Sequence, residues 1–288
     1  MINAFSVDVE DYFQVTAFEG DISRRDWDRF ECRVVANTRR LLRLLAGHGV
    51  HATFFVLGWI ADRYPELVRE IAQAGHELAS HSYWHRLIYQ MSPEEFREDL
   101  LRSRESLETA AGQRIDAFRA PSFSITRQSL WALEILAEEG FRIDSSIFPT
   151  RHHRYGIPTA VPKLHELETR SGRLWEFPPA VRRYPGVNLP VAGGGYFRLY
   201  PLNFTCRALS RINRAGDPFV FYVHPWELDP EQPRLRAGSR VSRVRHHVNL
   251  ATTEKKLDLL LSRFRFGSLS DVIQARAGGS PLERCLSA

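Results

Sequence analysis

The fold is decided by residues 51–85, HATFFVLGWIADRYPELVREIAQAGHELASHSYWH. The β-branched and aromatic run at 51–57 predicts a strand, and the apolar spacing over 60–74 predicts a helix that ends at Gly75. Residues 76–80 predict a second, short strand. Two strands joined by a helix indicate a parallel pair with a right-handed crossover.

The same alternation continues on both sides of this stretch. The elements expected from pattern are strands at 2–9, 115–119, 141–145, 174–177, 219–223 and 265–269, and helices at 37–46, 92–111, 127–139, 202–215 and 253–264. The proline- and glycine-rich stretch 150–195 is expected to be mostly loop, with Gly193–Gly195 allowing a tight turn. We therefore predict an α/β fold. A barrel-like domain is the preferred architecture, and an open doubly wound sheet is the alternative. No G-x-G-x-x-G follows the first strand, which argues against dinucleotide binding.

The composition is that of a globular protein with a large core. The 288 residues are 43% hydrophobic and 25% charged, so the core needs no disulfide or structural metal. Cys32, Cys206 and Cys285 are scattered and form no C-x-x-C pair, which predicts reduced thiols. The N-terminal stretch MINAFSVDVEDYFQV does not resemble a signal peptide, and no window is long and apolar enough to span a bilayer. We therefore expect a cytoplasmic protein.

The net charge of +5 is compatible with an acidic polymer or a membrane surface as partner. Basic residues gather at 234–247, where arginines and histidines interleave. No helix-turn-helix, RNA-binding or zinc-finger signature is present, so nucleic-acid binding is not expected. A solvated, arginine-rich surface is the simpler interpretation of the charge, and peripheral membrane contact stays open.

Three carboxylates stand at the end of the first predicted strand, in the run Asp8-Val9-Glu10-Asp11. Alternation along a strand places Asp8 and Glu10 on the same side. Carboxylates buried together need a cation or a proton to compensate their charge. Since ligands bind at the carboxyl ends of parallel strands, this run is a candidate for a functional site.

Two histidines follow the third predicted strand, in His81-Ser82-Tyr83-Trp84-His85. If this segment turns helically, the i, i+4 spacing brings both imidazoles to one side. Neutral imidazole is a good zinc ligand, and two histidines with one carboxylate from the first strand would make a metal site with open positions. The sequence lacks H-E-x-x-H, so the usual metalloprotease helix is excluded.

Two further polar residues end strands within apolar clusters. Arg119 lies in FRAPSF (118–123) and could hold a carboxylate bidentately. His224 lies in FYVHPW (221–226), where partial burial would suit it to act as an acid. Asp144 ends another strand and could pair with His224. A surface arginine and a structural histidine are the alternative interpretations.

Five motifs stand in order along the chain: SVDVED, HSYWH, FRAPSF, DSS and FYVHPW. Together they resemble the polysaccharide deacetylase family (NodB-type homology, carbohydrate esterase family 4) over residues 2–226. HATFFVLG and GHELASHSYWH are similar to the second and third strands of that family with their flanks. The resemblance implies a distorted (β/α) barrel and a divalent metal, usually zinc.

The resemblance also implies a role for each matching residue: Asp8 as the general base, His81 and His85 as metal ligands, Arg119 as the group that orients Asp8, His224 as the general acid and Asp144 as the residue that tunes it. The acidic motif departs from the commonest pattern, in which base and ligand are adjacent aspartates, because Val9 separates Asp8 from Glu10. Some members of the family have an Asp-x-Asp pattern, in which one residue separates the base from the metal ligand. By analogy with them Glu10 would be the metal ligand, and Asp11 is the alternative. The aromatic residues expected to contact a sugar, unless they are packed in the core, are Tyr83, Phe123 and Trp226.

These observations predict an enzyme, a hydrolase that removes N-acetyl groups from the amino sugars of a polysaccharide or its lipid-linked precursor. Residues 1–226 would form the deacetylase domain, and 227–288 an extension packed on the same domain. The extension resembles that of exosortase-associated deacetylases, which implies exopolysaccharide biosynthesis in a Gram-negative bacterium. Such a role would place the cytoplasmic enzyme at the inner face of the inner membrane. A metal amidohydrolase acting on a small non-sugar amide and a non-catalytic carbohydrate-binding protein are the alternatives.

Overall fold

The computed structural model describes residues 1–152 and 154–277. Residues 278–288, which include Cys285, lie outside the described residues. The strands are β1 Asn3–Val9, β2 Thr53–Val56, β3 Glu77–Ser80, β4 Ala117–Phe118, β5 Ile143–Asp144, β6 His165–Thr169, β7 Gly172–Glu176, β8 Val181–Tyr184, β9 Val187–Pro190, β10 Val220–Val223 and β11 Phe266–Gly267. The helices are α1 Val34–Gly47, α2 Gly58–Arg63, α3 Pro65–Gln73, α4 Pro93–Ala111, α5 Trp131–Glu138, α6 Gly194–Leu199, α7 Leu202–Arg214, α8 Arg240–His247, α9 Leu250–Leu261 and α10 Leu269–Arg276.

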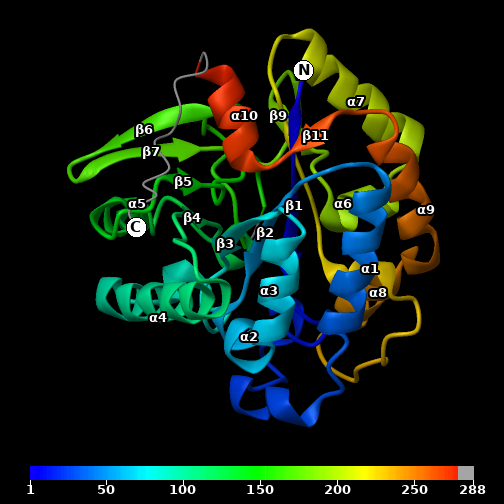
Figure 1. The fold of residues 1–288 in the computed structure, drawn as a ribbon. Helices are drawn as coiled ribbons and strands as arrows, with labels where there is room; N and C mark the ends of the chain where they lie inside the picture. The colour runs from blue at the N-terminus through cyan, green and yellow to red at the C-terminus, as the bar shows by residue number, and fades with distance from the viewer. Residues whose placement is uncertain (153, 278–288) are drawn as a thin grey trace.

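The main sheet curls into an incomplete barrel. Its order is β10-β1-β2-β3-β4-β5-β7-β6, with β11 beside β1, and every pair is parallel except β6–β7. Beyond β7 the chain returns to the opposite edge, where Pro179 bridges Val220 of β10 and Gly193 bridges Tyr222. Single bridges therefore take the place of a full strand ladder, and the predicted distorted (β/α) barrel is confirmed (Figure 1).

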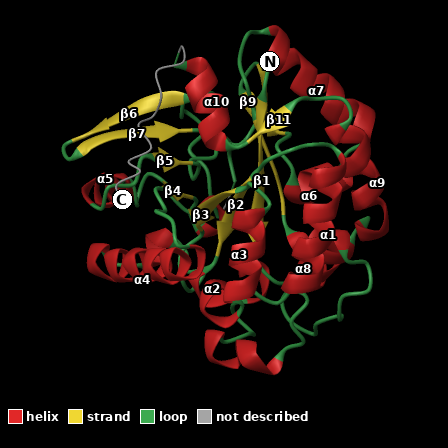
Figure 2. Ribbon diagram, in the orientation of Figure 1, coloured by secondary structure: helices red, strands yellow, loops and turns green. Residues whose placement is uncertain are grey.

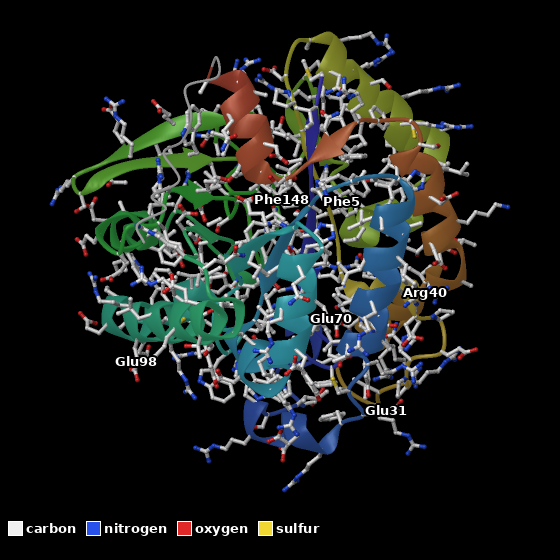
Figure 3. The ribbon with its side chains drawn as sticks, in the orientation of Figure 1. Phe5, Glu31, Arg40, Glu70, Glu98 and Phe148 are labelled. Atoms are coloured by element: carbon white, nitrogen blue, oxygen red, sulfur yellow. The ribbon has the colours of Figure 1, made fainter. Side chains whose placement is uncertain are left out.

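Helices surround the strands, with α1, α7 and α9 on one side and α4 and α5 on the other (Figure 2). Helix α1, for example, buries an apolar stripe that includes Val34, Leu41 and Leu45. Phe5 and Phe148 lie in the interior, whereas Glu98 of α4 points outward (Figure 3).

Helix α10 closes the end of the barrel at which the strands begin. Its first residue, Leu269, donates its backbone N–H to Oγ1 of Thr53 at 2.8 Å, and the Ser270 hydroxyl donates to Glu77; Thr53 and Glu77 are the first residues of β2 and β3. The apolar side chains that α10 buries against the strands belong to one cluster, which includes Leu269, Val272, Ile273, Ala4, Phe55, Ile143 and Val220. Since this end is filled, the opposite, carboxyl end of the strands is where a site can open.

Three sequence predictions need correction. The helix expected at 60–74 is two helices, α2 and α3, because Tyr64 takes φ −131° and ψ 58° before Pro65, and a residue that precedes proline avoids the helical conformation. The stretch 150–195 holds four strands, two of which form the β8–β9 hairpin. Helix α10 was not predicted. Residues 227–276 pack on the same sheet through β11 and α10, whereas the domain boundary at 226 stays a prediction.

Candidate active site

The polar motifs meet at the carboxyl end of the barrel. Asp8 is the penultimate residue of β1, His81 follows β3, Arg119 follows β4 and His224 follows β10. Because these strands are parallel neighbours, the residues that end them converge on one edge. Contacts join them: His81 bonds to the backbone of Arg119, Arg119 to Asp8, and Asp8 faces His224.

Glu10, His81 and His85 form a buried group whose nitrogen and oxygen atoms lie within 4.8 Å of one another. His81 Nδ1 is 2.8 Å from the backbone oxygen of Arg119, which fixes the ring and leaves Nε2 for another partner. Burial lowers the pKa of His81 to about 4, so its imidazole is neutral, as a metal ligand must be.

The contact between Glu10 and His85 lacks hydrogen-bond geometry. Oε2 of Glu10 is 2.7 Å from Nε2 of His85, yet among the described residues it accepts no hydrogen bond. Burial raises the pKa of Glu10, but the charges of His85 and His224 outweigh it and lower that pKa to about 2. A carboxylate oxygen and two imidazole nitrogens that face one another without hydrogen bonds are a donor set that fits a divalent metal.

The histidine segment does not turn helically, so that expectation is wrong. Ser82 and His85 take the left-handed conformation, with φ of 68° and 53°. Non-glycine residues adopt such angles only where surrounding contacts hold them. The imidazoles of His81 and His85 therefore meet because the loop is bent, with ring centroids 5.3 Å apart.

A buried carboxylate, Asp99, and a partly exposed guanidinium, Arg24, hold this loop, and neither was predicted from the sequence. Asp99 of α4 accepts the backbone N–H of Tyr83 at 2.7 Å and of Trp84 at 3.1 Å. Arg24 donates to the backbone oxygens of Trp84 and His85 at 2.6 and 3.1 Å. Asp99 thus binds backbone N–H groups of the loop, and Arg24 binds its backbone carbonyl oxygens, so both kinds of backbone group are held.

Arg119 holds Asp8 through one nitrogen. Nη1 donates to Oδ1 of Asp8 at 2.6 Å and to the Ser6 hydroxyl at 2.8 Å, while Nε and Nη2 donate to the backbone oxygen and hydroxyl of Ser145. The expected bidentate contact is wrong, because Ser145 occupies the rest of the guanidinium. Oδ2 of Asp8 is left facing Nε2 of His224 at 3.9 Å.

His224 lies between three carboxylates. Its Nε2 is 3.6 Å from Oε1 of Glu10, and its Nδ1 is 3.2 Å from Oε2 of Glu227. Burial lowers the pKa of His224, but Glu10 and Glu227 outweigh it and raise that pKa to about 9. Glu227 in turn accepts from Nε of Arg198 at 2.8 Å.

Asp144 is not the partner of His224, which corrects the expected pairing. Its carboxylate accepts the hydroxyl of Ser146 and lies against Glu176 of β7, and within the described residues no contact joins it to His224. Glu227, and not Asp144, is the carboxylate beside Nδ1 of His224. The three-residue spacing from His224 to Glu227, in a 3₁₀ turn that begins at Pro225, was the available sequence signal.

Asp11, the alternative metal ligand, points away from the histidines. Its carboxylate oxygens accept the backbone N–H groups of Tyr12, Arg33 and Val34 at 2.7 to 2.9 Å, which caps the start of α1. Both oxygens are therefore engaged, and the geometry favours Glu10 over Asp11.

A cleft of about 400 Å³ opens beside this group and is lined by Glu10, His224 and Trp226, among others. Trp226 donates its Nε1 hydrogen to Oε1 of Glu10 at 3.1 Å and stacks between His224 and His246. Tyr83 and Phe123, the other aromatic candidates, do not line the cleft: the Tyr83 hydroxyl donates to Asp62, and Phe123 packs on Phe148 and Tyr222.

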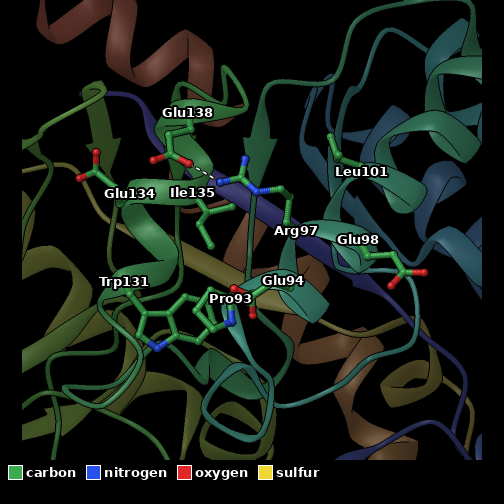
Figure 4. A pocket seen from close by; sticks show the side chains of 9 residues that line it. All are labelled: Pro93, Glu94, Arg97, Glu98, Leu101, Trp131, Glu134, Ile135 and Glu138. Carbon is green, nitrogen blue, oxygen red and sulfur yellow. Dashed lines mark hydrogen bonds and ion pairs between the residues drawn. The ribbon is translucent and has the colours of Figure 1, made fainter.

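A second hollow, of about 530 Å³, lies between α4 and α5 (Figure 4). It holds the ion pair between Arg97 and Glu138, the exposed Glu94 and the partly buried Glu134. None of the motif residues lines it, so the chemistry belongs to the first cleft.

Among the described helices, none is long and apolar enough to cross a membrane.

The comparisons with known proteins agree with this geometry. Residues 27–141 match the polysaccharide deacetylase family, and residues 145–274 match a domain family of unknown function, DUF3473. A peptidoglycan-N-acetylglucosamine deacetylase of Bacillus cereus is 35% identical over 34% of this chain and 36% of its own length. A chitooligosaccharide deacetylase of a Bradyrhizobium species is 32% identical over 35% of this chain and 43% of its own. The matches thus span less than half of these relatives.

Two solved structures share the fold across nearly the whole chain. A Mycobacterium smegmatis protein provisionally named a polysaccharide deacetylase has a TM-score of 0.63 at 22% identity, covering 99% of this chain and 93% of its own. PuuE allantoinase has a TM-score of 0.61 at 16% identity, covering 96% and 90%. The family match covers the segment that carries His81 and His85, so residues 27–141 of this chain form a polysaccharide deacetylase domain (NodB-type, carbohydrate esterase family 4).

Proposed function

We propose that this protein is a metal-dependent N-deacetylase that hydrolyses the acetamide of amino sugars in a glycan. The observation that carries the proposal is the buried group of Glu10, His81 and His85, flanked by a carboxylate, Asp8, and by an imidazole, His224. The deacetylase names of the relatives support the same reaction class.

Glu10, His81 and His85 would hold the metal, and two histidines with one carboxylate suit zinc. A divalent cation bound there supplies Lewis acidity, which polarises an acetamide carbonyl and lowers the pKa of water. Asp11 is not part of this set, since it caps α1.

Asp8 is placed to act as the general base. Arg119 fixes Oδ1 at 2.6 Å, so Oδ2 remains to accept the proton of the attacking water. The hydrogen bond to a buried guanidinium also holds this carboxylate in one orientation. Arg119 acts through Asp8 and is therefore a positioning residue.

His224 is placed to act as the general acid. Glu227, on Nδ1, orients the ring and favours its protonated form, so that Nε2 faces Asp8 and Glu10 with a proton to donate. Transfer of that proton to the departing nitrogen lets acetate and the free amino sugar separate. The role expected of Asp144 passes to Glu227.

The biological setting is proposed from sequence resemblance alone: exopolysaccharide assembly, on a polymer or its lipid-linked precursor at the cytoplasmic side. The structural likeness to an allantoinase concerns the fold and does not favour a small amide as substrate.

Acetate release from N-acetylglucosamine oligomers tests the proposal, with zinc content measured on the same samples. We expect release by the wild type, loss after chelation, and recovery with zinc. His81→Ala is expected to lose bound zinc and at least about a thousandfold in rate, since the metal contributes several kcal/mol and each 1.36 kcal/mol is tenfold.

Asp8→Asn is the matched control, because it should keep the zinc and lose the rate. A wild-type protein that binds zinc but releases no acetate from any amino-sugar glycan would contradict the deacetylase proposal. Equal activity of wild type and His81→Ala would contradict the metal site.

A further inference from the structure

Helix α8 has one buried face and one exposed apolar face. On the buried face, His246 stacks on Trp226 with ring centroids 4.2 Å apart, and its Nε2 is 2.8 Å from Oε1 of Gln232. On the other face, Val241 and Val244 are exposed by 60% and 68%. These valines are the two most exposed large hydrophobic side chains in the part of the chain that the structure describes. Single exposed hydrophobic residues are common, but two of them together on one short helix indicate a contact surface.

Arginines flank the two valines on the helix surface. With about 3.6 residues per turn, Val241 and Val244 are neighbours, and Arg240 and Arg245 lie on either side of them. Both arginines are exposed, and among residues 1–152 and 154–277 no carboxylate pairs with either. Apolar side chains between exposed cations are typical of a helix that lies in a membrane interface.

The segment that leads into α8 adds charge of the same sign. Arg234 and Arg236 are exposed, and the sequence from 232 to 253 contains no aspartate or glutamate. Asp21 contacts this segment, but its Oδ2 accepts the backbone N–H of Gly238 at 2.6 Å. Residues 234–245 therefore present a positively charged surface, which attracts an anionic partner.

Helix α8 is held in a fixed place beside the cleft. Nη1 of Arg198 donates to the backbone oxygens of Arg245, His246 and Val248 at 2.9 to 3.0 Å. Leu199, the last residue of α6, is exposed by 51% and lines the same cleft as α8 does. In Figure 1, α8 lies toward the lower end of the barrel, the end toward which β1 runs. A surface that binds α8 is therefore next to the mouth of the cleft.

We propose that α8 docks the protein on an anionic lipid bilayer, with Val241 and Val244 in the headgroup region and Arg240 and Arg245 against lipid phosphates. An acidic polysaccharide would account for the arginines but would leave the valines in water, whereas a bilayer accounts for both. Docking places the mouth of the cleft at the membrane surface, within reach of a glycan that is anchored to a lipid. The inference goes beyond the proposed reaction and does not depend on it.

Co-sedimentation of the full chain with vesicles tests the docking. The vesicles consist of phosphatidylcholine alone or of equal parts of phosphatidylcholine and phosphatidylglycerol, and binding is measured at low and at physiological salt. We expect the protein to bind the anionic vesicles at least about tenfold more tightly than the neutral ones, and less tightly at the higher salt because ions screen the charges.

Two double variants of α8 separate the charged contact from the apolar one. Each arginine near an anionic surface changes the binding constant about fivefold, so Arg240→Gln with Arg245→Gln should weaken binding about 25-fold at low salt. Val241→Ser with Val244→Ser should weaken it about tenfold, and this loss should persist at the higher salt because apolar burial is not screened.

Matched controls come from other faces of the molecule. Arg207→Gln with Arg214→Gln removes the same charge from exposed arginines of α7, which do not line the cleft. Val161→Ser with Val187→Ser removes two other exposed valines. Both controls should bind anionic vesicles nearly as the wild type does, and circular dichroism with thermal unfolding checks that all variants keep the fold.

Three results would overturn the docking: no binding to vesicles, equal binding to both kinds of vesicle, or equal losses in the α8 variants and their controls. A soluble polyuronate that binds where vesicles do not, and that loses affinity with the arginine variant but not with the valine variant, would also overturn it and identify an acidic polymer as the partner. Asp8→Asn should bind vesicles as the wild type does. Failure of the proposed reaction, which acetate release reports, is thereby distinguished from failure of the docking.

Discussion

Two buried carboxylates, Glu10 and Glu227, lie beside His224, and protein groups satisfy both oxygens of only one of them. Glu227 has a partner for each oxygen: Arg198 donates to Oε1 at 2.8 Å, and His224 meets Oε2 at 3.2 Å. Glu10 has Trp226 on Oε1, but its Oε2 accepts no hydrogen bond among the described residues, although His85 is 2.7 Å away. A buried acceptor without a hydrogen bond is costly, so the Glu227 arrangement is complete within the fold, whereas Oε2 of Glu10 is open to a cation.

The contrast follows the two parts of the chain that match different families. The part that matches the deacetylase family, 27–141, carries His81, His85 and Arg119. The part that matches DUF3473, 145–274, carries Arg198, His224 and Glu227. The proposed metal group thus draws its histidines from one part, and the proposed proton donor, His224, comes from the other together with its counterion Glu227.

The largest effect that this comparison predicts is the fall in the free energy of unfolding when Arg198 is replaced. Arg198→Met leaves Glu227 buried without its cation, and removing one partner of a buried pair costs about 3–5 kcal/mol. We expect urea unfolding of the metal-free protein to report a loss of this size in the free energy of unfolding. Chelation of the wild type, by contrast, should abolish activity while cooperative unfolding persists.

Arg39→Met is the control for this prediction, because Arg39 and Glu70 form an ion pair that is largely exposed. Such pairs contribute about 0–1 kcal/mol. If Arg198→Met and Arg39→Met lower the free energy of unfolding by the same amount, Arg198 is not the cation that stabilises the buried carboxylate of Glu227.

The sequence was sufficient where a residue's place follows from the strand that it ends. Asp8, His81, Arg119 and His224 follow consecutive parallel strands or end them, so the topology alone brings them together. The spacing within one strand likewise placed Asp8 and Glu10 on the same side, and both now face His224.

The sequence was insufficient where a side chain is chosen by tertiary packing. Asp144 and Glu227 both follow or end a strand region, but only the fold decides which of them lies beside His224. Arg198 is separated from Glu227 by 29 positions and carries no local motif. Asp99 and Arg24 reach the histidine loop from a helix and a 3₁₀ turn that pattern analysis could not orient.

A smaller effect is expected from loosening the loop that presents the metal ligands. Asp99→Asn keeps the shape of the side chain but leaves one acceptor oxygen for the two N–H groups of Tyr83 and Trp84. Because residues that orient metal ligands typically affect affinity 10–100-fold, we expect zinc affinity to fall by about that factor. Competition with a chromophoric chelator measures it, and excess zinc should restore much of the rate.

Glu98→Gln is the matched control on α4, since Glu98 is exposed and points away from the loop (Figure 3). Unchanged zinc affinity in Asp99→Asn would show that the loop keeps its conformation without this contact. Lost activity that excess zinc does not restore would mean that Asp99 supports more than the placement of the histidines.

The smallest effect concerns a third buried carboxylate, Glu176, which is compensated by a proton. Burial and the neighbouring Asp144 raise the pKa of Glu176 well above its ordinary value of 4.5. The folded state therefore keeps a proton that the unfolded state loses, so the free energy of unfolding falls as pH rises above about 4.5, by up to about 1.4 kcal/mol per pH unit for one proton.

Glu176→Gln replaces the protonated acid by a neutral amide and should flatten this dependence. Urea unfolding at several pH values between 5 and 8 measures it; parallel curves for the variant and the wild type would mean that Glu176 is ionised in the fold. In that case Arg119, whose charge lowers the pKa of Glu176, would be the compensating group, and all three carboxylates would depend on cations.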